Sequence, residues 1–133
     1  MLGLNGLYDL PDLVNALDEA HEHLHEDYAG LLSNAFGSEQ SAWPAASPAR
    51  FDPVALAERV QGGKAPSLVM LDQSAEDQLV PMGQRAKFEA ALTKVEGLQV
   101  VRGHRCSGKH AVAWEEGIMM WESIQDVFQA LQA

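Results

Sequence analysis

The spacing of apolar side chains predicts a chain built mainly of helices, with a few short strands. Helices are expected at residues 10–20, 25–35, 82–94 and 115–131, with a short one after Pro53. Gly37 ends the second of these helices. In the last helix we expect an inward face made of Ile118, Met119, Trp121, Ile124, Val127, Phe128 and Leu131.

Two compact apolar runs, residues 66–71 and 98–101, predict strands, because each run is bounded by turn residues. The first run has the composition of a strand that is buried on both faces. Residues 1–4 are also apolar and resemble the end of a further strand. The fold class predicted is α/β, with two or three parallel strands flanked by helices.

So few strands are unusual for a parallel sheet, and we therefore expect residues 1–133 to form a single partial domain. Its first part, residues 1–52, would be a helical segment with a pocket loop, and residues 53–133 a βαβα unit. The loop at 37–52 is rich in Ser, Ala and Pro but contains Trp43, which predicts an ordered surface or pocket-lining segment.

Composition narrows the functional classes. The 133 residues include 19 acidic and nine basic side chains, a net charge of −10, which argues against a nucleic-acid partner. No apolar run approaches the roughly 18 residues that would span a membrane. The single cysteine, Cys106, excludes an internal disulfide and fits a reducing compartment, so we expect a cytoplasmic protein.

Polar loops follow the two apolar runs, at residues 72–81 and 103–114. The carboxyl ends of parallel strands share one edge of a sheet, where ligands and catalytic groups gather. An acid in one loop and a histidine in the other can form the Asp–His pair of a hydrolase. The carboxylate orients the imidazole, whose other ring nitrogen takes a proton from a nucleophile.

Four sequence patterns point to one family. They are Gly6-Leu7-Tyr8-Asp9-Leu10, Ala35-Phe36-Gly37 with Trp43 and Ser47-Pro48, Ser74-x-x-Asp77-x-Leu79-Val80-Pro81, and Gly108-x-His110-x-x-x-Trp114. Together they resemble the carboxyl-terminal half of an α/β-hydrolase. Within that superfamily the chain is most similar to the kynurenine formamidase (arylformamidase) and carboxylesterase-like proteins of fungal type.

The resemblance implies an enzyme of tryptophan catabolism that hydrolyses a small-molecule amide or ester, N-formylkynurenine, to kynurenine and formate. It implies a Ser–Asp–His triad with no cofactor and no metal. Asp77 matches the acid of that triad and His110 the base. Asp72 and Glu76 are rival acids, and His104 is a rival base.

The nucleophile of the family has no match here, because no serine lies in a Gly-x-Ser-x-Gly elbow. The family order Ser, Asp, His places that serine before Met1. Two main alternatives stay open: a hydrolase represented by its carboxyl-terminal half, or a non-catalytic truncated remnant or pseudoenzyme that at most binds a partner. A third is an independent small binding domain. The partner expected is a second copy or a missing amino-terminal half.

Three other patterns have simpler explanations than a functional site. His21 and His25 have the i, i+4 spacing of a zinc pair but lack an obvious third ligand, which favours a solvated helical turn. Cys106 could form a dyad with His110, yet it follows no helix-start signal, so we expect a spectator thiol. The stretch 60–64 resembles part of a phosphate loop but precedes its strand.

Overall fold

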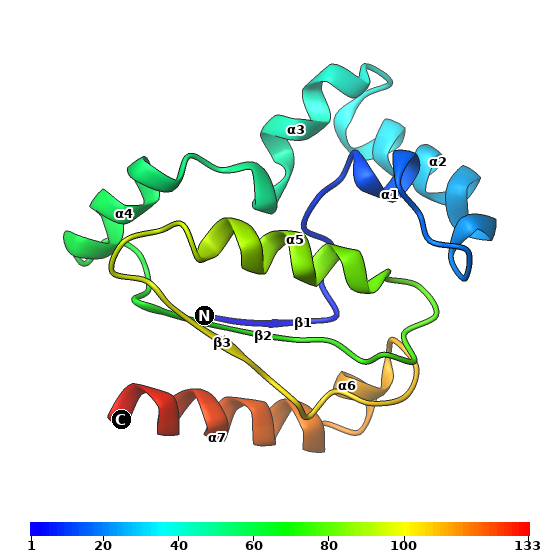
Figure 1. The fold of residues 1–133 in the computed structure, drawn as a ribbon. Helices are drawn as coiled ribbons and strands as arrows, with labels where there is room; N and C mark the ends of the chain where they lie inside the picture. The colour runs from blue at the N-terminus through cyan, green and yellow to red at the C-terminus, as the bar shows by residue number, and fades with distance from the viewer.

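Three short parallel strands form the centre of the computed structural model, which describes all 133 residues (Figure 1). The strands are β1 (Leu2–Leu4), β2 (Leu68–Asp72) and β3 (Gln99–Arg102), in the order β1-β2-β3. All five residues of the central strand β2 are buried, as expected for a strand covered on both faces. The predicted small parallel sheet flanked by helices is therefore confirmed.

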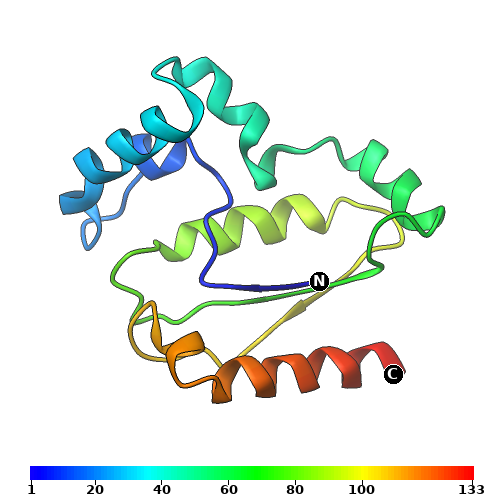
Figure 2. The same cartoon turned by 180° about the vertical axis from the view of Figure 1, so that it is seen from behind.

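The helices form layers on both sides of this sheet. Their bounds are α1 (Asp12–Asn15), α2 (His25–Phe36), α3 (Trp43–Ala46), α4 (Pro53–Gln61), α5 (Met82–Leu92), α6 (Val112–Glu115) and α7 (Ile118–Gln132), with 3-10 turns η1 (Glu22–Leu24), η2 (Gln40–Ala42) and η3 (Pro48–Arg50). Helices α4 and α5 lie on one face and α7 on the other, while α1 to α3 gather on the α5 side (Figures 1 and 2). None of the helices combines the length and apolar character that crossing a bilayer requires.

Two hydrophobic clusters dominate the interior. Between the sheet and α5, the Tyr8 and Phe88 rings stack with centroids 4.5 Å apart and pack with Leu71. The second cluster joins α1, α2 and α3 around Trp43, which is only 1% exposed. Trp43 anchors the predicted surface and pocket-lining segment 37–52 in the core, where its only side-chain polar atom donates to the Gly37 carbonyl and can be buried without loss.

The helix predicted over residues 10–20 is wrong in length. Helix α1 ends at Asn15, and the chain then turns. The Asp18 carboxylate accepts the backbone N–H of His21 at 3.1 Å, a local bond of the kind by which aspartate competes with helix formation.

The last predicted helix is divided, and its apolar face is misplaced. Gly117 adopts a positive φ of 72° and separates α6 from α7. Four of the seven side chains expected to face inward are instead 56–61% exposed: Ile118, Trp121, Phe128 and Leu131. Met119, Ile124 and Val127 are half-buried. Periodicity identifies an apolar face of a helix but not whether another element covers it.

One buried glutamine ties the strand exit to α5. Gln84 Oε1 accepts the backbone N–H groups of Tyr8 and Asp9, both at 2.8 Å, and its Nε2 donates to the Asp9 carbonyl. The Asp9 carboxylate in turn accepts two hydrogen bonds from Arg50, at 2.9 and 3.0 Å. Burial alone would raise the pKa of Asp9, but the Arg50 hydrogen bonds and the Lys87 charge outweigh it and lower that pKa.

We expect Gln84→Leu to lower the free energy of unfolding by roughly 2–5 kcal/mol, because it leaves two buried N–H donors and one carbonyl unpaired. Denaturant titration measures the change. Gln61→Leu, on the exposed side of α4, is the matched control and should change stability little. Equal effects of the two substitutions would contradict the role assigned to Gln84.

The exposed α7 side chains should bind a hydrophobic dye and promote self-association at high concentration. The net charge of −10 opposes association but is screened beyond about 8 Å at physiological salt. Trp121→Gln should reduce dye fluorescence and association without loss of stability, whereas Gln129→Ala on the same helix should not. A chain that sediments as a monomer and binds no dye would contradict this expectation.

Candidate functional site

The structure brings Asp77 and His110 together at the carboxyl end of the sheet. His110 Nδ1 lies 2.9 Å from Asp77 Oδ2 and 3.1 Å from Oδ1. The Asp77 side chain is 1% exposed and that of His110 22%. A carboxylate can only accept, so Nδ1 carries the proton in neutral His110 and the Nε2 lone pair is left free.

A tight turn presents the Asp77 carboxylate. Its Oδ1 accepts the backbone N–H groups of Leu79 and Val80, both at 2.9 Å. The buried Gln73 side chain holds the far end of this turn by donating to the Val80 carbonyl at 2.7 Å. The carboxylate orientation is therefore fixed by backbone donors of its own loop.

The backbone of His110 is anchored on two sides. Its N–H donates to Gln78 Oε1, and its carbonyl accepts from Asn5 Nδ2, each at 3.0 Å. Asn5, directly after β1, also accepts the Ser74 N–H at 3.0 Å and so joins the ends of all three strands. Its φ of 46° lies in the left-handed region, which asparagine tolerates better than most residues. Trp114 packs edge-on against the imidazole, with ring centroids 4.9 Å apart.

Asp72, the rival acid at the end of β2, has a different role. One of its oxygens accepts the Gln73 N–H, and the other accepts those of Arg105 and Cys106 at 2.6 and 3.0 Å. The second loop passes so close that a Cβ added to Gly103 would lie 2.6 Å from the Asp72 Cβ. Asp72 therefore shapes the loop that carries His110.

The two other rivals stay apart from the pair. Glu76 is exposed, and its carboxylate accepts the Gly108 N–H at 3.4 Å. His104 is exposed and makes no hydrogen bond. Neither meets a partner that would make it an acid or a base of a catalytic pair.

No serine, threonine or cysteine makes a hydrogen bond with His110 Nε2. The Ser74 hydroxyl, which is nearby in sequence, donates to the Gly108 carbonyl and closes the two loops on each other. Burial and then the neighbouring Asp72 charge raise the pKa of Cys106 to about 12, which keeps it a thiol at neutral pH. A Cys106–His110 dyad is therefore not supported.

The two histidines of the suggested zinc pair have separate partners. His25 is exposed and faces Glu26, whereas His21 is buried between Asp18 and the Asp77 carbonyl. No group of three or more His, Cys, Asp or Glu side chains is placed to hold a metal ion. Sequence reasoning missed Asn5 and the buried state of His21. The sequence offers a signal for Asn5 alone, because this residue directly follows an apolar run; it offers none for the burial of His21.

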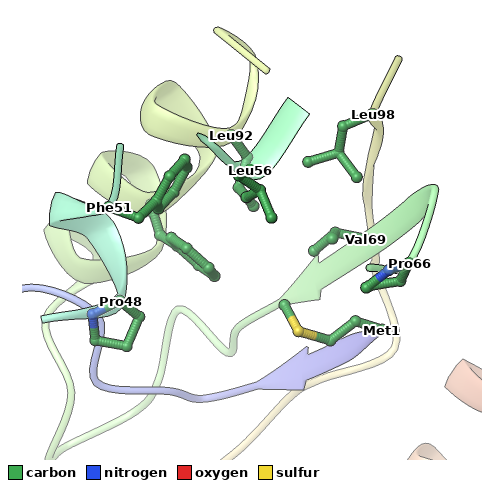
Figure 3. Close-up of a pocket in the computed structure, with 9 residues that line it drawn as sticks. Met1, Pro48, Phe51, Leu56, Pro66, Val69, Leu92 and Leu98 are labelled. Atoms are coloured by element: carbon green, nitrogen blue, oxygen red, sulfur yellow. The ribbon is translucent and has the colours of Figure 1, made fainter. Parts of the chain in front are cut away.

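An apolar cavity of about 190 Å³ lies at the other end of the sheet (Figure 3). Its lining consists of Met1, Pro48, Phe51, Leu56, Pro66, Val69, Phe88, Leu92 and Leu98. Pro66 and Leu98 precede their strands, whereas Asp77 and His110 follow them. The cavity therefore does not adjoin the pair.

Comparison with known proteins finds a likeness to a fungal enzyme. The chain is 30% identical over 128 residues to kynurenine formamidase avaC of Aspergillus versicolor. The aligned region covers 89% of this chain and 45% of that relative, so the chain spans about half the length of the protein it matches. No protein-family model matches the chain. No solved structure matches it either.

We expect Gly103→Ala to destabilise the protein by roughly 1–3 kcal/mol, because the new methyl group must displace the buried Asp72 carboxylate or the loop. Thermal and denaturant unfolding measure the loss. Gly83→Ala, in α5 with no atom within 4 Å of the added Cβ, is the control and should be neutral or stabilising by up to about 1 kcal/mol. A stable Gly103→Ala variant would show that the loop does not depend on this close approach.

Proposed function

We propose that this chain is the acid- and base-bearing part of an α/β-hydrolase whose triad serine lies outside these residues. The single observation that carries the proposal is the Asp77–His110 hydrogen bond, with the second ring nitrogen of His110 left free. The likeness to a kynurenine formamidase supports hydrolysis of an N-formyl amide, with an ester as the related substrate. In this proposal residues 1–133 form one partial domain.

The chemistry follows from the pair. His110 Nε2 takes the proton of a serine hydroxyl as its oxygen attacks the formyl carbon, and Asp77 stabilises the imidazolium that forms. Collapse of the tetrahedral intermediate breaks the C–N bond, and His110 returns the proton to the leaving amine. Water then attacks the formyl ester with the same base, which releases formate and restores the serine.

The competing function is a non-catalytic binding protein. It is favoured by one observation, the lack of any nucleophile bonded to His110 Nε2. The two proposals differ in a measurable way, because only the hydrolase depends on His110 when a serine-bearing half is present.

We expect the chain alone to hydrolyse neither p-nitrophenyl acetate nor N-formylkynurenine above an imidazole control, because it lacks the acyl-accepting serine. Supplying a polypeptide half that carries a Gly-x-Ser-x-Gly elbow should restore turnover. In that complex His110→Ala should lower kcat by roughly a thousandfold or more.

His104→Ala is the matched control, since the side chain is exposed and unbonded, and it should change kcat by about twofold or less. Equal losses at the two histidines would contradict the assignment of His110. Labelling of the isolated chain by a fluorophosphonate would contradict the absence of a nucleophile. No turnover in any complex would favour the binding protein.

A further inference from the structure

His21 contacts the backbone of Asp77 in the candidate site, although its sequence pattern favours a solvated turn. It is 7% exposed, and both of its ring nitrogens are engaged. Nδ1 lies 2.5 Å from Asp18 Oδ1, and Nε2 lies 2.9 Å from the backbone carbonyl oxygen of Asp77. The ring therefore joins the first helical layer to the very residue that orients His110.

The chemistry of the two partners fixes the protonation of His21. An ionised carboxylate and a backbone carbonyl are acceptors only, and neutral imidazole has a single N–H to donate. Both contacts can be hydrogen bonds only when the ring carries two protons. With Asp18 ionised, the geometry therefore favours an imidazolium inside the protein.

The charges around His21 support the same conclusion. Asp18 faces it from its own segment and Asp77 from the loop, while Tyr28 of α2 donates to the Leu79 carbonyl in that loop. Neither Asp18 nor Asp77 forms a salt bridge with a lysine or an arginine. Burial alone would lower the pKa of His21, but the bonds to Asp18 and to the Asp77 carbonyl outweigh it and raise that pKa.

We propose that His21 is a positioning residue for Asp77: as an imidazolium it holds the Asp77 carbonyl and so fixes the turn whose carboxylate receives the His110 ring. Asp77 is then held at two points, its backbone by His21 and its side chain by Leu79, Val80 and His110. The catalytic role of the contact between His21 and the Asp77 carbonyl rests on the proposed function, but the contact itself does not.

The sign of the pH dependence follows from the raised pKa. The stabilisation that His21 contributes is complete below its unfolded pKa, about 6.5, and is lost as the pH rises through the higher folded value. The turn therefore loosens on the alkaline side. A general base acts in its deprotonated form, which favours activity as the pH rises. In a hydrolase built on this site, the activity should accordingly fall on the alkaline side of the pH profile as His21 loses its proton.

Nitrogen NMR of the imidazole rings in the full chain tests the protonation directly. We expect His21 to titrate at a higher pH than histidine in an unfolded peptide, about 6.5, and to carry protons on both nitrogens below that pH. Asp18→Asn should lower the pH at which His21 titrates. Titration of His21 at or below the unfolded-peptide value in the unaltered chain would overturn the proposal.

Hydrogen exchange of the Leu79 and Val80 amides, corrected for the intrinsic rate, tests the positioning role. Their protection should fall roughly ten- to a hundredfold as His21 loses its proton, the factor expected for one charge-assisted hydrogen bond. His21→Gln retains a donor without a titrating charge and should abolish this pH-dependent step. His25→Gln is the matched control and should retain it.

A pH-dependent step that persists in His21→Gln would overturn the proposal, and so would protection in His21→Ala equal to that of the unaltered chain. If His21→Ala does not fold, His21→Gln and Asp18→Asn carry the test. Neither measurement needs a substrate, so both remain decisive even if the chain proves not to be a hydrolase. In an active complex, Asp18→Asn should move the alkaline limb of kcat to lower pH while His25→Gln leaves it in place.

Discussion

The buried carboxylate of Asp72 is the group on which the candidate site depends. It lies at the end of the central strand and accepts three backbone N–H groups, one from its own loop and two from the loop after β3. Burying a carboxylate without such donors costs free energy, and this cost holds the two loops together around Asp72. Asp77 lies five residues after Asp72, and His110 lies five residues after Arg105, whose N–H the Asp72 carboxylate accepts. Both loops are therefore fixed at the same contact before they reach the pair.

From that point the two loops are closed by polar side chains rather than by hydrophobic packing. Asn5 donates to the His110 carbonyl and accepts the Ser74 N–H, while the Ser74 hydroxyl donates to Gly108. Because a hydrogen bond is directional, such a network fixes the angle between the two loops as well as their separation. This angle decides whether the imidazole meets the carboxylate in its plane.

The features of the fold that depend on a local residue pattern could be predicted from the sequence. The strands, α2 and α5 follow from apolar spacing, and the closeness of Asp77 to His110 follows from the rule that parallel strands end at one edge. Prediction failed where a distant partner decides the outcome. The α7 face is exposed because none of the other elements covers it. Asn5 and His21 act on residues 105 and 56 positions away, which no local pattern reveals.

The distribution of cations explains why histidines surround Asp77. The chain has only nine lysines and arginines against 19 acids, and those in ion pairs serve other carboxylates. Arg50 and Lys87 hold Asp9, and Arg105 holds Asp126. Asp77 is left with the ring of His110 at its carboxylate and that of His21 at its carbonyl. Lysine and arginine keep their charge across the physiological range, whereas histidine does not. The hold of the His21 ring on the Asp77 carbonyl therefore depends on a group that gains and loses its charge with pH, whatever reaction the site serves.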